Sequence, residues 1–95
     1  MRSPVADDIR NNSNLHRYEL DIEGQAAVLY YKLSPGLITF AHTETPLALR
    51  GRGVASRLVR AALQAARVQG LKVTAKCPFV ASYIAKHPEF GDLLQ

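Results

Sequence analysis

The sequence predicts a small α+β domain, in which antiparallel strands lead into a parallel strand–helix–strand unit and a short helix follows near the C-terminus. Three observations predict this class. Apolar and polar residues alternate between turns from Arg17 to Thr43, which is typical of strands. Gly53–Gln69 has the apolar spacing of an amphipathic helix, and Leu71–Cys77 alternates again. A strand joined to an earlier strand through a helix usually lies parallel to it.

Length and composition agree with one domain around one core. The chain has 95 residues, of which 47% are hydrophobic and 21% are charged, the balance of a globular protein. Its longest apolar run, Ala26–Tyr31, is far shorter than the roughly 20 residues that a membrane-spanning helix needs. Met1–Asn14 lacks the apolar centre of a secretory signal. We therefore expect a cytoplasmic protein without a membrane partner.

The chain begins with a segment that has no periodicity. Met1–Asn14 mixes serine, proline, asparagine and charged residues, so we expect a flexible arm before a domain that spans residues 15–95. From Arg17 the alternation becomes strict and predicts a half-buried strand that ends before a turn at Gly24. Its apolar side has Tyr18, Leu20 and Ile22, and its polar side has Arg17, Glu19 and Asp21.

Two more strands follow. Ala26–Leu33 is rich in β-branched and aromatic residues and predicts an antiparallel partner for the first strand. After the turn Ser34-Pro35-Gly36, Leu37–Thr43 predicts a third strand. Strict alternation puts Ile38, Phe40 and His42 on one face of it, and we expect both faces to be covered.

The second half of the chain contains the predicted crossover. The helix at Gly53–Gln69 ends at Gly70, and Leu71–Cys77 is a fourth strand that Pro78 stops. The expected apolar face of the helix has Val54, Leu58, Ala61, Ala62 and Ala65, and its polar face has Arg57, Arg60, Gln64 and Arg67. Phe79–Lys86 predicts a short helix closed by Pro88, and Glu89–Gln95 a tail or a final turn.

This topology predicts where a ligand binds. The carboxyl ends of parallel strands lie side by side, so His42, Cys77 and the helix start near Gly53 should meet at one rim of the sheet. Ligands of open α/β sheets usually bind at that rim.

The charges predict an anionic ligand. Residues 1–44 contain four basic and six acidic side chains, whereas residues 45–95 contain eight basic and two acidic. Nucleic acid is disfavoured because the chain has no tryptophan and no basic runs interleaved with aromatic residues. A small phosphorylated ligand fits the charge distribution as well as nucleic acid or better.

The single cysteine excludes an intramolecular disulfide, and three histidines without zinc-type spacing lead us to expect no metal.

The segment Arg50–Ala55 is the best candidate for the anion site. It places glycines and arginines at the start of the long helix, where free N–H groups and the helix dipole suit phosphate oxygens. A tight turn is the alternative interpretation of its two glycines. The segment fits neither the P-loop nor the dinucleotide fingerprint, so a nucleotide triphosphatase is disfavoured.

The pattern Arg50-x-x-Gly53-x-Ala55 resembles the Q/R-x-x-G-x-G/A signature of the GNAT acetyltransferases. The similarity runs from about Tyr18 to Phe90 and points to the short, single-domain GNAT-like N-acetyltransferases. Its other elements are His42-Thr43-Glu44, Leu58, Cys77-Pro78-Phe79-Val80, Tyr83 and His87-Pro88.

The resemblance implies a minimal GNAT-like fold with acetyl-coenzyme A or coenzyme A between the strands that end at His42 and Cys77. It also implies that a small-molecule or peptide amine accepts the acetyl group. The chain has no room for the helices and C-terminal strands that often shape the acceptor site of full-length relatives. The residues implied for the coenzyme are Arg50, Gly51, Arg52, Gly53, Val54, Ala55, Ser56 and Arg57.

Four residues are candidates for catalysis, each with a structural alternative. Cys77 precedes Pro78, so we expect it near a helix N-terminus, a position that favours the thiolate. Cys77 could accept the acetyl group, contact the coenzyme thiol, or be a small buried residue. His42 could act as a base or be a hydrogen-bonded core residue. Glu44 is a second possible base or a solvated carboxylate. Tyr83 lies where the resemblance implies a proton donor to the departing thiolate, or it packs on the sheet.

The function that fits these observations is acetyl transfer to an amine, directly or through Cys77. Two alternatives stay open. The missing acceptor elements favour a coenzyme A or acyl-coenzyme A binding module without turnover, and the basic second half favours a nucleic-acid-associated module. The sequence specifies neither the acceptor nor an oligomeric state.

Overall fold

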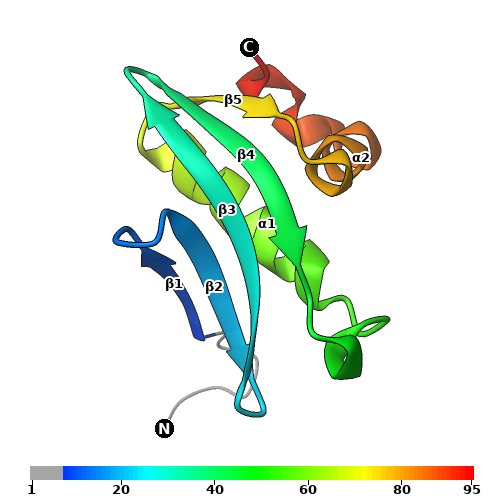
Figure 1. Ribbon diagram of the computed structural model, residues 1–95. Coiled ribbons are helices and arrows are strands. Elements are labelled where there is room, and N and C mark those ends of the chain that lie inside the picture. Colours follow the sequence, from blue (N-terminus) through cyan, green and yellow to red (C-terminus); the bar gives the residue numbers. More distant parts are fainter. Residues whose placement is uncertain (1–7) are drawn as a thin grey trace, which may run out of the picture.

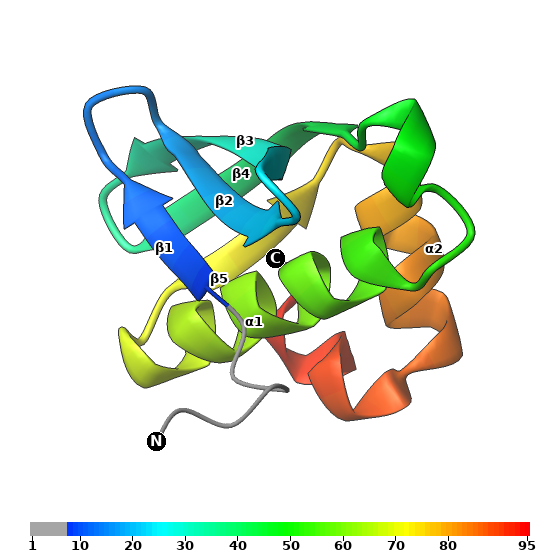
Figure 2. The ribbon, with the colours of Figure 1, turned by 90° about the horizontal axis from the view of Figure 1, so that it is seen from below.

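The computed structural model describes residues 8–95, which form a mixed five-stranded sheet with α1 and α2 on the same side of it (Figures 1 and 2). In chain order the elements are β1 (Asp8–Asn12), β2 (Arg17–Ile22), β3 (Gln25–Ser34), β4 (Leu37–Glu44), the 3-10 turn η1 (Leu47–Leu49), α1 (Val54–Val68), β5 (Lys72–Ala75), α2 (Pro78–Lys86) and the 3-10 turn η2 (Pro88–Leu93). No helix in this part of the chain is long and apolar enough to cross a membrane.

The topology is the predicted one. The strands are arranged in the order β1-β2-β3-β4-β5, with antiparallel pairing up to β4 and a parallel pair between β4 and β5. Helix α1 connects the two parallel strands, so the expected strand–helix–strand unit is confirmed, as is the α+β class.

The N-terminal strand was not expected. Residues 8–14 fall within the predicted flexible arm, but Asp8–Asn12 pairs with β2, with Ile9 opposite Leu20. The prediction is wrong there because this edge strand has a single apolar residue and is joined to β2 by ion pairs of Arg10 with Glu19 and Asp21. Residues 1–7 lie outside the described residues, and for them the arm stays a prediction.

Helix α1 covers one face of the sheet and contributes six buried residues to the core. Its buried residues are Val54, Leu58, Val59, Ala62, Leu63 and Ala66. Ala61 and Ala65, which were expected in this stripe, are only partly buried. The stripe is centred closer to Val59 and Leu63 because these larger side chains bury more apolar area than alanines do.

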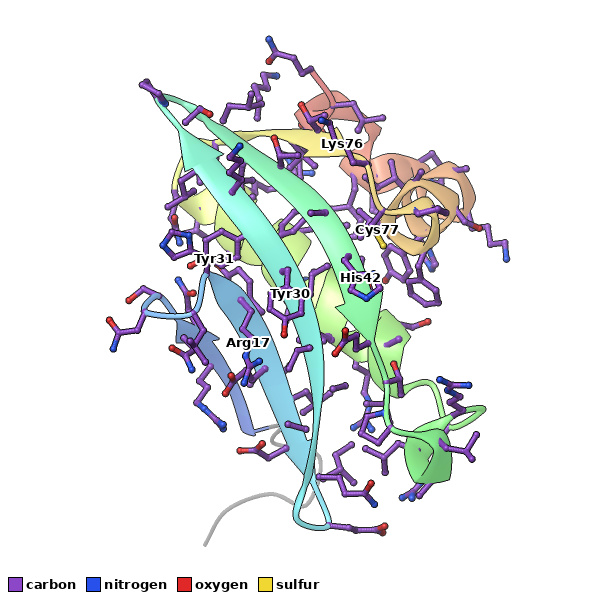
Figure 3. The ribbon with its side chains drawn as sticks, viewed as in Figure 1. Arg17, Tyr30, Tyr31, His42, Lys76 and Cys77 are labelled. Atoms are coloured by element: carbon purple, nitrogen blue, oxygen red, sulfur yellow. The ribbon has the colours of Figure 1, made fainter. Side chains whose placement is uncertain are left out.

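The other face of the sheet is open, contrary to the expectation that both faces are covered. Figure 3 looks onto this face. The Arg17 guanidinium lies 5.6 Å from the centre of the Tyr30 ring, and Tyr30 stacks on His42 at 6.2 Å. Glu19 belongs to the same face but is only 2% exposed, because its carboxylate lies against Arg10, Arg17 and Asn12.

A bulge in β4 changes the direction of its last side chains. Tyr31 pairs with Phe40 and Tyr30 pairs with His42, so Ala41 has no partner of its own in β3. Each extra residue reverses the alternation. Phe40 therefore faces the core while His42 joins Tyr30 on the open face, and the prediction that His42 shares a face with Ile38 and Phe40 is wrong.

The C-terminal residues close the core. The predicted tail or turn is η2, which buries Phe90 and Leu93. Leu94 forms a parallel bridge with Val73, and the N–H of Gln95 donates to the Val73 carbonyl at 3.0 Å. The segment thus covers the outer edge of β5.

Candidate functional site

The two parallel strands separate at the end of β5. Their ladder ends with Phe40 opposite Ala75, and the N–H groups of Lys76 and Cys77 both donate to the Phe40 carbonyl at 3.0 Å. The chain then turns into α2, while β4 continues to Glu44. The residues of β4 beyond Phe40 therefore have no strand beside them on this edge.

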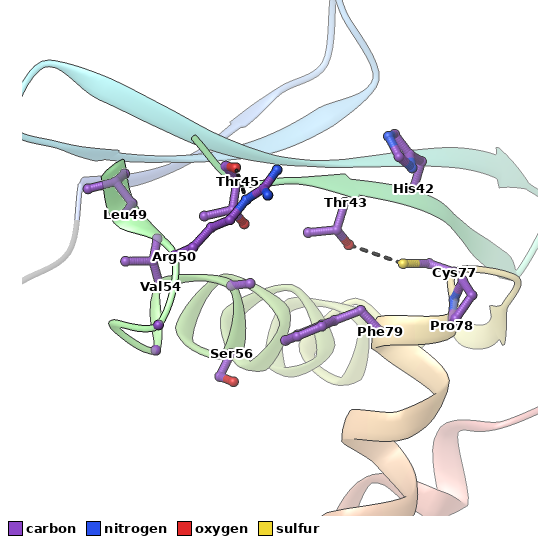
Figure 4. A pocket seen from close by; sticks show the side chains of 13 residues that line it. His42, Thr43, Thr45, Leu49, Arg50, Val54, Ser56, Cys77, Pro78 and Phe79 are labelled. Atoms are coloured by element: carbon purple, nitrogen blue, oxygen red, sulfur yellow. Dashed lines mark hydrogen bonds between the residues drawn. The ribbon is translucent and has the colours of Figure 1, made fainter. Parts of the chain in front are cut away.

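A cavity of about 530 Å³ opens at this point, between the end of β4 and the starts of α1 and α2 (Figure 4). The lining residues are His42, Thr43, Thr45, Leu49, Arg50, Gly51, Gly53, Val54, Ala55, Ser56, Cys77, Pro78 and Phe79. The predicted meeting of His42, Cys77 and Gly53 at one rim is confirmed, because all three border this cavity.

The loop before α1 presents main-chain donors to the cavity. Gly51 and Gly53 have φ values of 79° and 72°, in the left-handed region that favours glycine. A Cβ on either would meet nothing within 4 Å, so the backbone conformation, and not crowding, requires glycine there. The first N–H of α1 that finds a helical acceptor is that of Arg57, which donates to the Gly53 carbonyl at 3.1 Å.

The amides of the preceding residues, Val54, Ala55 and Ser56, therefore have no acceptor within the helix. The first turn contains no acidic residue, and no side chain caps it. These N–H groups and the positive end of the helix dipole are suited to an anion.

The structure divides the eight residues expected to bind the coenzyme. Six of them line the cavity, namely Arg50, Gly51, Gly53, Val54, Ala55 and Ser56. The Nε of Arg50 donates to the Thr45 carbonyl at 3.2 Å, which joins its side chain to the loop after β4. Arg57 is exposed and is not among the lining residues.

Arg52 lies outside the cavity lining and makes a two-point ion pair with Glu23, at 3.1 and 3.2 Å. Hydrogen bonding to Arg52 lowers the pKa of Glu23, and the same contact raises the pKa of Arg52. The pair connects the β2–β3 turn with the loop before α1.

Cys77 is the N-cap residue of α2 and is 3% exposed. Its Sγ lies 3.1 Å from the Thr43 hydroxyl oxygen, and either atom can be the donor (Figure 4). Thr43 was not a predicted site residue. The bulge turns it toward Cys77, and its sequence signals were a hydroxyl at the predicted rim and its place in the segment His42-Thr43-Glu44 of the resemblance.

The candidate bases are on the opposite side of β4 from the thiol. His42 borders the cavity from the strand, but its imidazole extends away from Thr43 and Cys77 (Figure 4). The His42 Nε2 is 3.2 Å from Glu44 Oε2, and the two side chains are 61% and 59% exposed. Glu44 does not line this cavity.

Tyr83 belongs to a different cluster. It is buried, stacks on His87 at 3.9 Å and packs against Phe90 at 6.2 Å. A hydrogen bond with Tyr83 raises the pKa of Arg60, so its side chain also meets α1. Tyr83 is not among the residues that line the cavity, and its catalytic role stays a prediction.

Within residues 8–95, no group of three or more histidine, cysteine, aspartate or glutamate side chains is arranged to hold a metal ion.

Comparison with known proteins identifies the family. A family model described as GCN5-related N-acetyl-transferase matches residues 17–93. The chain belongs to the GCN5-related N-acetyltransferase family. A GCN5-like protein from Staphylococcus aureus, determined by NMR in solution, superposes with a TM-score of 0.68 and 25% identity, over 93% of this chain and 87% of that one. The GNAT-like fold is thereby confirmed.

The chain is also similar to part of longer proteins. Protein NATD1 from Gallus gallus and from Mus musculus are each 34% identical over 64 residues, or 67% of this chain. The matched part spans only 58% of the length of these relatives. Family membership supports an N-acetyltransferase-like role for the chain.

Proposed function

We propose that the protein binds acetyl-coenzyme A in the cavity at the end of β4 and transfers the acetyl group to a primary amine. One observation carries this proposal: the residues of the α1 N-terminus whose amides lack a helical acceptor line the same cavity as the gap between β4 and β5. The amides at the start of α1 suit the pyrophosphate of the coenzyme, and the unpaired edge of β4 suits its amide-containing arm.

The residues present fit both parts of that ligand. The amides of α1 and the Arg50 guanidinium suit the pyrophosphate. The end of β4 has no strand beside it on the β5 edge, and there it offers backbone groups to the amides of the pantetheine arm. Leu49, Val54 and Phe79 supply apolar wall between them.

The coenzyme supplies an acetyl group activated as a thioester. In direct transfer, His42 or Glu44 accepts a proton from the ammonium before its nitrogen attacks. In the covalent route, Cys77 takes the acetyl group first. We favour direct transfer, because the thiol of Cys77 has no base beside it, and its place at the N-terminus of α2 is the one feature that favours the thiolate. The partner of Cys77 is the weakly basic Thr43 hydroxyl, and His42 extends from the opposite side of β4.

Thermal unfolding with coenzyme A tests the binding site. A ligand at 100 times its Kd stabilises a protein by about 2.7 kcal/mol, which raises the Tm of a domain this small by roughly 10 °C or more. Gly53→Ala should abolish this shift. Gly36→Ala is the matched control, since Gly36 has a similar φ of 71° at a turn away from the cavity. No shift in the wild-type protein would contradict the proposal.

Coenzyme release tests turnover. Thiol titration with acetyl-coenzyme A and an amine should show steady release, and Cys77→Ala should retain it if transfer is direct. Loss of all transfer in a folded Cys77→Ala protein would favour the covalent route. A thermal shift without release for any amine would instead favour a coenzyme A binding module.

A nucleic-acid-associated module is less well supported. Several arginines that give the second half its charge are occupied by acidic partners: Arg52 by Glu23, Arg60 by Glu89 at 3.8 Å, and Arg67 by Asp92 at 2.8 Å. Each pair reduces the positive potential that a phosphate backbone would meet.

A further inference from the structure

A second cavity of about 550 Å³ adjoins the first. Its lining residues are Ala26, His42, Thr43, Glu44, Thr45, Pro46, Leu47 and Arg50. Four of these, His42, Thr43, Thr45 and Arg50, also line the first cavity. The end of β4 and the residue after it are therefore a wall that both cavities share.

The walls of the second cavity differ in chemistry. At one side are the imidazole of His42 and the carboxylate of Glu44, 3.2 Å apart. Ala26, Pro46 and Leu47 provide apolar surface, and Leu47 is 78% exposed. The positive charge of Arg50 lies where the two cavities meet.

We propose that the second cavity binds the acetyl acceptor, and that this acceptor is a primary ammonium on an unbranched aliphatic stem without a second charge at its far end. The inference rests on the proposed function. Glu44 pairs with the ammonium, while Pro46 and Leu47 pack against the methylene groups. The far wall is apolar, so a second charge of either sign would lose its hydration there without gaining a partner, because the coenzyme phosphates occupy the Arg50 guanidinium in the proposed complex.

The His42–Glu44 pair also determines where a proton can go. A carboxylate only accepts hydrogen bonds, so Nε2 of His42 donates to Glu44 and Nδ1 of the neutral ring is left as the acceptor. The ammonium gives one proton to Nδ1, and from there it passes to solvent. The amine nitrogen forms a bond to the acetyl carbon, the carbon–sulfur bond breaks, and the second proton goes to the coenzyme sulfur.

Three amines of equal length test the acceptor class: hexylamine, 1,6-diaminohexane and 6-aminohexanoate. We expect kcat/KM for hexylamine to exceed that of the diamine and of the amino acid by about tenfold or more. A preference for either doubly charged amine would overturn the proposal.

Two variants test the cavity itself. Leu47→Arg adds a cation to the lining and should raise the KM for hexylamine about tenfold, with the Kd for coenzyme A unchanged. Leu33→Arg is the control, because Leu33 is also an exposed leucine but lies outside both cavities. Equal KM values in the two variants would overturn the proposal.

Binding without turnover provides an independent readout. Hexylamine added to ¹⁵N-labelled protein with coenzyme A should shift the amides of Ala26, Glu44 and Leu47, and Leu47→Arg should reduce these shifts. If coenzyme A binds and amines are acetylated but these amides do not move, the acceptor cavity is wrong while the proposed function stands. If coenzyme A neither binds nor is released, the proposed function itself fails.

Discussion

The bulge at Ala41 separates the two kinds of chemistry at this site. On the core side of β4, the Thr43 hydroxyl contacts the Cys77 thiol in the cavity proposed for the coenzyme. On the open side, His42 contacts Glu44 in the cavity proposed for the amine. Without the extra residue, His42 and Thr43 would exchange faces. One residue therefore determines whether the imidazole meets the thiol or the acceptor.

Glu19 makes the stability of the domain depend on pH. Burial by itself would raise its pKa, but hydrogen bonds from Arg17 and Asn12 and the charges of Arg17 and Arg10 outweigh it and lower the pKa below 4.5. A lowered pKa in the folded state means that the carboxylate stabilises the fold above pH 4.5. This contribution disappears as the pH falls through the folded pKa.

We expect Glu19→Gln to lower the free energy of unfolding near neutral pH by about 1 kcal/mol, a modest effect because Arg10 is half exposed and solvent screens the pair. Urea unfolding near pH 7 and about pH 3 measures it. The difference between wild type and variant should be smaller at the lower pH. A difference that is constant across this range would contradict the role assigned to the charge.

At the scale of elements, the β2–β3 turn and the loop before α1 act as one unit. Glu23 and Gly24 form the two-residue turn, both with positive φ, and Glu23 holds Arg52 between the two glycines of the cavity loop. A two-residue turn of this kind matches the twist of its strands and is rigid. The ion pair therefore restrains the loop that carries the main-chain donors.

Glu23→Gln should weaken coenzyme A binding by about two- to fivefold, since an exposed pair restrains a loop only modestly. Isothermal titration at low and high salt measures this, and high salt should reduce the difference between the proteins. Tighter binding by the variant would mean that Glu23 competes with the coenzyme for Arg52, contrary to the positioning role.

The elements from Arg17 to Lys86 were predictable because their periodicity is regular and turn residues separate them. β1 was not, because a strand held by Arg10 and its acidic partners leaves no apolar pattern. The bulge was not predictable either, since Ala41 is an ordinary strand residue and only the pairing of β4 with β3 shows that it is an extra residue. The cavity loop was predictable from its glycines, whereas Thr43 became a site residue only through the bulge.

At the scale of the whole molecule, the proposed coenzyme cavity depends on elements that lie far apart in the sequence. The end of β4, the start of α1 and the start of α2 form its walls, and α2 is held against α1 by η2 at the C-terminus. Figure 2 shows η2 beneath α1, on the side away from the sheet. The contacts that hold the walls of the cavity in place are therefore also contacts of the core.

Leu93 tests whether stability and coenzyme binding can be separated. Leu93→Ala removes a side chain that is 5% exposed and should lower the free energy of unfolding by about 2–3 kcal/mol. Leu94→Ala is the matched control, because its neighbouring side chain is 44% exposed and should cost less than about 1 kcal/mol. Equal losses in chemical denaturation would contradict this account of the core.

The free energy of unfolding that coenzyme A adds shows whether η2 affects the shape of the cavity. Stabilisation by a ligand depends only on its concentration and its Kd for the native state. If Leu93→Ala leaves the native cavity intact, saturating coenzyme A should add the same free energy to the variant as to wild type, about 2.7 kcal/mol at 100 times the Kd. We expect this result, since Leu93 does not line the cavity. A smaller increment in the variant would mean that η2 shapes the cavity through α2.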